Sequence, residues 1–301
     1  MKRTLTTLAT VLLIWIGGNL IHLLWIKVRH HIWNRNIVRD EQGLMEYAKG
    51  FSCGSGSTAL IFIHGFADLP KGWERITRRL TNRYDYACHA IRIPRWGETL
   101  VSQQGVTMDE IRNVIDLKIS DLSKDHDNIW LVGHSMGGAL AIDTIPRNTE
   151  NINGLAVLAP LIRVSDRRVP FATARFWFYI GKKLLWLNHT LESPFSEKVI
   201  AADDPDFSYS VDRFIPYSIY DILFEVTRNN RNINIPSELP VFCALSADDA
   251  VIDNDTAKAW FNGLKSEKKK LYIDRVAGHT LHIGKNWKEI TDELGAFVYE
   301  N

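Results

Sequence analysis

The sequence predicts an α/β protein built on a mainly parallel β-sheet with helices on both faces, together with a cap insertion and an N-terminal transmembrane helix. Short β-branched and apolar runs recur along the chain, and longer amphipathic stretches separate them. Such alternation gives parallel strands joined by helices. The 301 residues are 46% hydrophobic, which suffices for one large core. The expected strands are residues 45–51, 59–63, 86–91, 129–132, 154–158, 241–245 and 270–273.

The first element along the chain is an apolar N-terminal segment. Residues 5–26 contain no Asp, Glu, Lys or Arg, and as a helix they would span roughly 33 Å, close to the ~30 Å hydrocarbon core of a bilayer. A secretory signal peptide has a shorter apolar region and a small-residue cleavage site, whereas basic and bulky residues follow this segment. We therefore expect an uncleaved membrane anchor, with a cleaved signal as the alternative.

Basic residues on the two flanks of this segment indicate its orientation. Lys2 and Arg3 precede it, and four basic residues follow it: Lys27, Arg29, Arg35 and Arg39. The positive-inside rule thus favours a cytoplasmic catalytic domain by a small margin. The cysteines agree with this side, because Cys53, Cys88 and Cys243 form no CxxC pair and free thiols suit a reducing compartment.

The charge balance narrows the classes of partner. Lys and Arg total 36 against 35 Asp and Glu, so the formal net charge is +1. No excess of positive charge is present to neutralise a row of phosphates, and a nucleic-acid partner is not expected. A small-molecule or lipid substrate is compatible with this balance, and the oligomeric state is left open.

The next elements define the domain organisation. One apolar stripe has clear helical spacing and consists of Met108, Ile111, Ile115, Ile119 and Leu122. The alternation of strand and helix then breaks between residues 161 and 239, which are rich in Arg, Pro, Asn and aromatic side chains. We expect an insertion that lies over the end of the sheet. The predicted division is an anchor (1–30), a juxtamembrane segment with the first strand (31–57), a first part of the core (58–160), a cap or lid (161–239) and a second part of the core (240–301).

Residues 129–139 carry the strongest local signal for chemistry. An apolar strand runs directly into Gly133-x-Ser135-x-Gly137, and a helix of small and apolar residues follows. A sharp strand-to-helix turn of this kind exposes a nucleophilic serine above a sheet. Glycines are expected because a side chain at either position would strike the adjoining strand or helix, and the helix N-terminus brings N–H groups near the reacting oxygen. The alternative is a glycine-rich turn in which the serine has no catalytic role.

On this motif the chain resembles the α/β-hydrolase superfamily, and within it the bacterial carboxylesterases and monoacylglycerol lipases. The resemblance covers residues 58–160 and 240–301. It implies a catalytic triad in the chain order serine, acid, histidine, with Ser135 as the nucleophile. It also implies an acyl-enzyme intermediate and no cofactor or metal.

The segment Leu245-Ser-Ala-Asp-Asp-Ala-Val-Ile252 matches the acid-bearing turn of this family. In the family pattern the acid precedes the hydrophobic pair by two residues, which gives Asp249, with Asp248 as the alternative. A histidine base needs a carboxylate that holds its tautomer, so one of the two side chains is expected to be buried against it.

The family places its base directly after the last strand, where this sequence has Gly278 followed by His279. His279 is therefore the expected base. His282 lies three residues further on and could suggest a metal pair with His279. A zinc site needs further ligands, and no motif supplies them, so no metal is expected.

Residues 62–66 resemble the oxyanion loop of the family. This resemblance implies that the backbone N–H groups of Phe66 and Met136 face the developing oxyanion. His64 is then expected to be a structural member of the loop rather than a second base. The family's Pro-Gly-His-Gly turn is altered at residues 93–97, where Arg and Trp replace small or polar residues, and no role is carried over to that turn.

The resemblance implies a serine ester hydrolase, and the insertion bears on its substrate. Aromatic side chains crowd the first part of the insertion, mixed with Arg and Lys: Phe171, Phe176, Trp177, Phe178, Tyr179 and Trp186. They could line an acyl pocket, dip into a lipid interface or pack the cap on its own domain. With the anchor, they favour lipid-like esters such as monoacylglycerols or lysolipids. The alternatives are a thioesterase, an amidase, a haloperoxidase-like enzyme and a non-catalytic lipid-binding protein.

Overall fold

The computed structural model describes residues 2–230 and 233–301, and its core is a seven-stranded sheet. The strand order is β1-β3-β2-β4-β5-β10-β11, and all neighbours pair in parallel except β1, which is antiparallel to β3. The central strands are buried along almost their whole length, as expected for parallel strands covered on both faces. In chain order the strands of this sheet are β1 (Phe51–Cys53), β2 (Thr58–Ile63), β3 (Ala87–Ile91), β4 (Asn128–His134), β5 (Gly154–Leu158), β10 (Val241–Ser246) and β11 (Lys269–Asp274).

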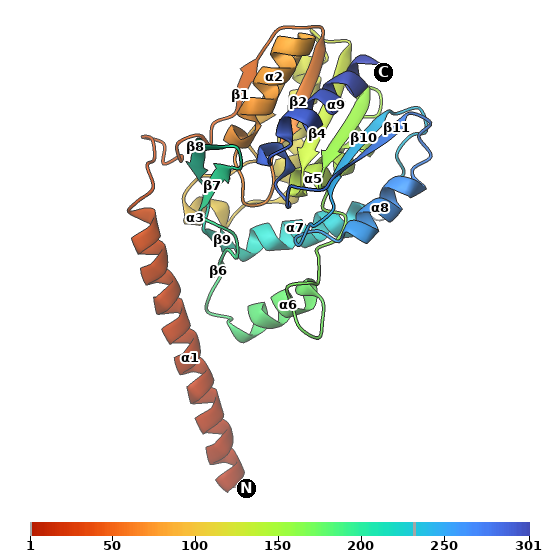
Figure 1. The fold of residues 1–301 in the computed structure, drawn as a ribbon. Coiled ribbons are helices and arrows are strands. Elements are labelled where there is room, and N and C mark those ends of the chain that lie inside the picture. The colour runs from red at the N-terminus through yellow and green to blue at the C-terminus, as the bar shows by residue number, and fades with distance from the viewer. Residues whose placement is uncertain (1, 231–232) are drawn as a thin grey trace.

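Helices cover both faces of this sheet. The chain steps from β2 to β3 in one direction along the sheet and from β4 to β5 in the other, so right-handed crossovers place the connecting helices on opposite faces. Figure 1 shows α2 and α9 packed together in front of the sheet and α5 behind it. The predicted α/β fold is confirmed. The helices of the core are α2 (Glu74–Tyr84), α3 (Leu100–Gln103), α4 (Met108–Leu122), α5 (Met136–Thr144), α8 (Asn254–Gly263) and α9 (Trp287–Tyr299).

Local sequence correctly predicts the position of α4 but not that of the first strand. The predicted apolar stripe is the buried face of α4, and the Thr107 side chain caps the helix by accepting a hydrogen bond from the Glu110 N–H (3.2 Å). The strand expected at residues 45–51 is wrong except at its last residue. Tyr47 has a φ of 66°, which an extended strand does not allow, and Met45 forms only an isolated bridge with Arg39.

The segment between β5 and β10 forms a separate layer at the carboxyl ends of the central strands (Figure 1). Its described residues form two α-helices and two small antiparallel sheets, in which β6 pairs with β9 and β7 pairs with β8. These short strands pair only with one another, which is why no regular alternation is visible in the sequence. The elements are α6 (Ala174–Leu184), β6 (Thr190–Glu192), β7 (Lys198–Ala201), β8 (Asp204–Ser210), β9 (Phe214–Pro216) and α7 (Tyr217–Asn229).

The N-terminal helix α1 (Lys2–Asn34) extends beyond the predicted apolar segment at both ends. Within the described part of the chain, its stretch Thr4–Asn34 alone is long and apolar enough to cross a bilayer. Figure 1 shows the N-terminal end of α1 projecting away from the rest of the molecule. The C-terminal half lies against the cap and buries Ile26 and Trp33.

Candidate active site

Ser135 lies at the sharp turn between β4 and α5, at the carboxyl end of the sheet. Its φ of 53° and ψ of −118° fall outside the ordinary regions for a residue with a side chain, at a cost of about 1–3 kcal/mol. The turn is held because the Ser135 N–H donates to the Leu158 carbonyl (3.0 Å) and the Ser135 carbonyl accepts from the Leu161 N–H (3.0 Å). The backbone thereby presents the serine hydroxyl above the end of β4.

The two glycines of the motif are required by close backbone contacts. A Cβ atom at Gly137 would lie 2.1 Å from the Ile63 carbonyl oxygen, and one at Gly133 would lie 2.4 Å from the carbonyl oxygen of Gly137. Both distances are too short for any real side chain. The expectation that a side chain at either position would strike its neighbours is confirmed.

The structure brings Ser135, His279 and Asp249 together from three separate loops. The His279 Nε2 lies 2.9 Å from the Ser135 Oγ, and the His279 Nδ1 lies 2.7 Å from an Asp249 carboxylate oxygen. Ser135 and Asp249 are buried, at 5% and 1% exposed. With Nδ1–H donating to the carboxylate, Nε2 is free to accept the proton of the hydroxyl. This geometry can activate the serine as a nucleophile.

Asp249 and Asp248 have different surroundings although they are neighbours. One carboxylate oxygen of Asp249 accepts hydrogen bonds from the N–H groups of Val251 (2.7 Å) and Ile252 (3.1 Å), and the other faces His279. Burial by itself would raise the pKa of Asp249, but the hydrogen bonds and the charge of His279 outweigh it and hold that pKa below its usual value. The Asp248 side chain is 97% exposed and lies 3.7 Å from Arg167.

The two predicted oxyanion donors lie on opposite sides of the serine in the sequence. Phe66 follows β2, and Met136 is the first residue of α5, so its N–H has no acceptor within the helix. Within the described part of the chain, neither N–H donates a hydrogen bond. Both groups are therefore available to a ligand.

Trp96 supports the Phe66 peptide, a role that no local sequence pattern predicted. Its indole Nε1–H donates to the Phe66 carbonyl at 2.6 Å, and the ring is buried at 2% exposed. This bond fixes the orientation of the loop that carries the Phe66 N–H. The turn at residues 93–97 departs from the family pattern, and it contributes to the site through the Trp96 side chain.

His64 takes the structural part expected of it. Its Nδ1–H donates to the Gly65 carbonyl (3.0 Å), and its Nε2 accepts from the Ile93 N–H (3.1 Å). Burial lowers the pKa of His64 to about 4, so the ring is neutral at pH 7. With both nitrogens engaged, it is not placed to act as a second base.

A group of three buried side chains lies beside the triad. Asp68, His134 and His282 are the single set of His, Cys and carboxylate groups, among residues 2–230 and 233–301, that could hold a metal ion, with ligand atoms within 4.8 Å of one another. Protein groups contact all three side chains, but the Nδ1 of His134 and both ring nitrogens of His282 have no hydrogen-bond partner among the described residues. Asp68 accepts from the Tyr209 hydroxyl (2.6 Å) and lies 3.0 Å from the His282 Nε2, while the His134 Nε2–H donates to the His279 carbonyl (3.0 Å). His134 thus links the nucleophile turn to the backbone of the histidine loop.

The electrostatics of this group favour one charge state. Burial lowers the pKa of His134 well below its usual value. Burial would raise the pKa of Asp68, but His282 and the other nearby histidines outweigh it and lower that pKa. At pH 7 the carboxylate is therefore ionised and the His134 ring is neutral. The alternative metal pair of His279 with His282 is not formed, because His279 faces Ser135 and His282 faces Asp68.

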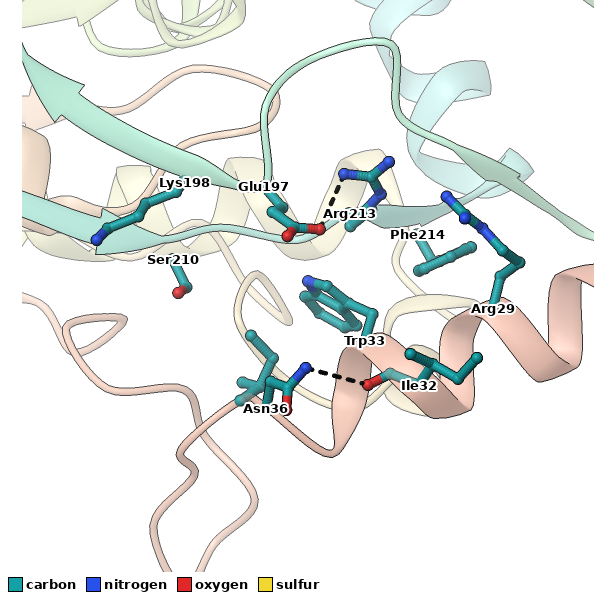
Figure 2. Close-up of a pocket in the computed structure, with 10 residues that line it drawn as sticks. Arg29, Ile32, Trp33, Asn36, Glu197, Lys198, Ser210, Arg213 and Phe214 are labelled. Carbon is teal, nitrogen blue, oxygen red and sulfur yellow. Dashed lines mark hydrogen bonds and ion pairs between the residues drawn. The ribbon is translucent and has the colours of Figure 1, made fainter.

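A cavity of about 710 Å³ opens onto Ser135 and His279. Its walls are mainly apolar, as is typical of a site for a hydrophobic ligand. The cap supplies most of them, including Val164, Trp177, Phe178, Leu191, Phe195 and Tyr220. A smaller cavity of about 350 Å³ lies between the end of α1 and the cap, and no triad residue lines it. Figure 2 shows Trp33 and Arg29 of α1 beside Arg213 and Phe214 of the cap at this junction.

Residues 54–286 match the protein family described as serine aminopeptidase, S33. The chain belongs to this family. The match covers more than half of the chain and includes all three residues of the Ser135–His279–Asp249 arrangement. The expected serine hydrolase of the α/β-hydrolase superfamily is confirmed.

This S33 hydrolase has relatives among lipolytic enzymes. The human monoglyceride lipase is 25% identical over 252 residues, which cover 78% of this chain and 79% of the relative. Among solved structures, a chain from the metagenome-derived lipolytic enzymes LipS and LipT has a TM-score of 0.69 at 16% identity, covering 86% of this chain and 100% of that chain. The monoglyceride lipase of Saccharomyces cerevisiae has a TM-score of 0.65 at 16% identity, covering 83% and 90%. The two structural likenesses establish the fold of the S33 hydrolase.

The Trp96 bond in this S33 hydrolase leads to a specific prediction. Replacing Trp96 by Phe keeps a buried ring but removes the donor to the Phe66 carbonyl, so we expect kcat to fall roughly tenfold with little change in KM. Steady-state kinetics on a soluble ester measure both constants. Trp73→Phe is the matched control, because Trp73 is equally buried and its Nε1 has no partner within the described residues. Equal kcat values for Trp96→Phe and wild type would contradict the prediction.

Proposed function

We propose that this chain is a membrane-anchored lipid esterase that cleaves carboxylic esters, such as monoacylglycerols or lysolipids, through an acyl-enzyme on Ser135. The single observation that carries the proposal is the hydrogen-bonded series from Asp249 through His279 to Ser135, which lies at the floor of a large apolar cavity. A reactive alcohol and an apolar wall are the two features that such a reaction needs.

In the proposed mechanism, His279 removes the proton of the Ser135 hydroxyl as its oxygen attacks the ester carbonyl. The charge that develops on the carbonyl oxygen is stabilised by the N–H groups of Phe66 and Met136. The alcohol then leaves with the proton from His279, and Asp249 stabilises the imidazolium while it exists. Water attacks the acyl-enzyme by the same route and releases the acid. No metal or cofactor takes part in these steps.

The family relationship supports the ester as substrate and leaves a second candidate. The human relative is a monoglyceride lipase, and its alignment extends over most of both chains. The description of the family as serine aminopeptidase favours an amide as the alternative substrate on the same triad. An amine leaves less readily than an alcohol, so the two reactions differ in their need for protonation of the leaving group.

The proposed anchor is α1, and the proposed domain division places residues 1–30 in the membrane. Its apolar stretch has the length that a bilayer requires. The basic residues that follow it favour a catalytic domain on the cytoplasmic side. The core of residues 58–160 and 240–301 then carries the triad, and the cap of residues 161–239 forms most of the cavity wall.

A series of p-nitrophenyl esters with acyl chains from two to sixteen carbons tests the substrate class. We expect kcat/KM to rise with chain length, because each buried methylene contributes about 0.8 kcal/mol in an apolar cavity. The Ser135→Ala variant measures the background, and aminoacyl p-nitroanilides report the amidase alternative. A maximum at acetate, or faster cleavage of the anilides, would contradict the proposal.

A further inference from the structure

Two of the three cysteines face each other at the edge of the sheet. In the antiparallel pair of β1 and β3, Cys53 and Cys88 are directly opposite partners, and both thiols are free. The Cα atoms of directly opposite residues in such a pair are about 4.5 or about 5.5 Å apart, and a disulfide can bridge either separation. Opposite residues also point to the same face of a sheet, so the two sulfur atoms lie on one side of it.

The strands that carry this pair are close together and able to adjust. A Cβ atom at Gly54 would lie 2.2 Å from the Tyr86 carbonyl oxygen, so the end of β1 is pressed against the start of β3. A disulfide needs Cβ atoms about 3.5–4.5 Å apart, slightly less than the about 4.5–5.5 Å of directly opposite residues. The strand β1 has three residues and lies at the edge of the sheet, beside α2 (Figure 1). It can therefore move by the small difference without disturbing the central strands.

The two thiols differ in their access to solvent. Cys88 is fully buried, at 0% exposed, whereas Cys53 is partly exposed. On the side of α2, the Cys53 Sγ lies 3.6 Å from the Thr81 hydroxyl oxygen. A small oxidant in solvent therefore reaches Cys53 first, and the Cys88 sulfur is reached by Cys53.

The contact between the thiols favours reaction at Cys53 as well. A hydrogen bond from the Cys88 thiol lowers the pKa of Cys53 and outweighs burial, which acts in the opposite direction. The nearby charge of Arg78 lowers the Cys53 pKa further, and the contact with Cys53 raises the pKa of Cys88. The thiolate is the form of cysteine that attacks oxidants. Cys53 is thus the better nucleophile, and Cys88 keeps its proton until Cys53 has reacted.

Cys243 shows what an inert thiol looks like in the same sheet. It lies in the middle of β10, opposite Val157 on one side and Leu271 on the other, and it is 0% exposed. Burial raises its pKa. Cys243 therefore has neither a cysteine partner nor access to solvent, and it serves as an internal comparison for the other two.

We propose that Cys53 and Cys88 form a hydroperoxide-sensitive pair that closes to a reversible disulfide. The Cys53 thiolate attacks one oxygen of the hydroperoxide, and the O–O bond breaks as the S–O bond forms. The leaving oxygen takes up a proton and departs as an alcohol or water, which leaves a sulfenic acid on Cys53. The Cys88 sulfur then attacks the Cys53 sulfur and displaces hydroxide, which takes the Cys88 proton and leaves as water.

The electrons and protons balance in this sequence. The two thiols together lose two electrons and two protons, and the hydroperoxide takes up both to become water and an alcohol, or two waters if it is hydrogen peroxide. A small thiol such as glutathione restores the pair by thiol–disulfide exchange. A pair that is reduced at rest and closes on contact with an oxidant is typical of redox sensing in a reducing compartment.

The disulfide should stabilise the fold and leave catalysis unchanged. It would close the loop of residues 54–87 and fix the edge strand to the sheet, so we expect the thermal unfolding midpoint to rise by roughly 5 °C. Neither Cys53 nor Cys88 lines the catalytic cavity, and kcat for a soluble ester should stay the same.

Mass spectrometry of the oxidised protein tests the proposal. The full chain in detergent micelles is treated with a small excess of hydrogen peroxide, and the remaining thiols are alkylated under denaturing conditions. We expect one alkylated thiol, on Cys243, and an intact mass lower by two hydrogens before alkylation. Trypsin can cut between the pair at Arg79 and Arg83. A disulfide would therefore keep the peptides of Cys53 and Cys88 together until a reductant is added.

Three outcomes would overturn the proposal. The first is three free thiols after a treatment that oxidises glutathione in the same solution. The second is a disulfide between two copies of the chain through Cys53, and the third is overoxidation of Cys53 without a link to Cys88. Cys243→Ala is the matched control and should form the same disulfide at the same rate. These readouts need no activity, so they remain informative if the protein hydrolyses no ester.

Trapping with dimedone, which reacts with sulfenic acids, tests the roles of the two thiols. In Cys88→Ala the second step is blocked, so we expect peroxide treatment to leave a dimedone adduct on Cys53. In Cys53→Ser we expect Cys88 to remain a free thiol, because it is buried and keeps its proton. A dimedone adduct on Cys88 in Cys53→Ser, with none on Cys53 in Cys88→Ala, would contradict the assignment of Cys53 as the nucleophile.

Discussion

Replacing Ser135 by alanine should reduce kcat for ester hydrolysis by roughly 10⁴-fold to 10⁶-fold. The reason is that the substitution removes the Ser135 Oγ, which lies 2.9 Å from the His279 Nε2 and can form an acyl bond. The residual activity would come from the oxyanion donors and from substrate binding, which the substitution leaves in place. Initial rates with p-nitrophenyl butyrate, compared at equal protein concentration, measure the loss.

A structural control accompanies this prediction. Alanine keeps the unusual backbone angles of position 135 and removes a single oxygen, so the thermal unfolding midpoint should stay close to that of the wild type. Loss of activity together with a large drop in this midpoint would indicate a folding defect instead. Retention of more than a tenth of wild-type activity would show that another residue is the nucleophile.

Replacing Asp249 by asparagine should lower kcat by roughly 10³-fold to 10⁴-fold. The carboxylate accepts the His279 Nδ1–H at 2.7 Å, whereas an asparagine amide can donate to Nδ1 and leave the ring proton on Nε2. His279 would then present a donor to Ser135 and could not accept its proton. Steady-state kinetics across the pH range measure the effect.

Asp248→Asn is the matched control, one residue away. The Asp248 side chain is almost fully exposed and 3.7 Å from Arg167, an arrangement that contributes little, so we expect kcat within about twofold of wild type. A large effect at Asp248 with a small one at Asp249 would reverse the assignment of the acid. The pair of variants therefore separates the two residues that the sequence left as alternatives.

The elements that were predictable from sequence are those that obey a simple local rule. The stripe from Met108 to Leu122 became the buried face of α4, because helical spacing dictates which residues share a face. The motif around Ser135 predicted a strand before the serine and a helix after it, because its glycines fit only a tight turn. Both signals lie within a few residues and need no long-range contact.

The features that escaped prediction depend on partners far away in the chain. Trp96 acts on the Phe66 carbonyl, and His134 acts on the His279 carbonyl, so neither role has a local pattern. The first strand was misplaced because Tyr47 adopts a positive φ, which single-residue preferences do not foresee. The polar contact of Asn19 with the cap was equally invisible, since the sequence shows only a polar residue in an apolar helix.

Site mapping with a fluorophosphonate tests the central claim most directly. The reagent transfers its phosphonyl group to an activated serine oxygen, with loss of fluoride, and peptide mass spectrometry locates the adduct. We expect the adduct on Ser135, and we expect its formation to be greatly slowed in His279→Ala, which lacks the base. Ser165 and Ser196 also line the cavity and serve as internal comparisons. An adduct on either of them instead of Ser135, or no adduct in the folded wild-type protein, would contradict the account.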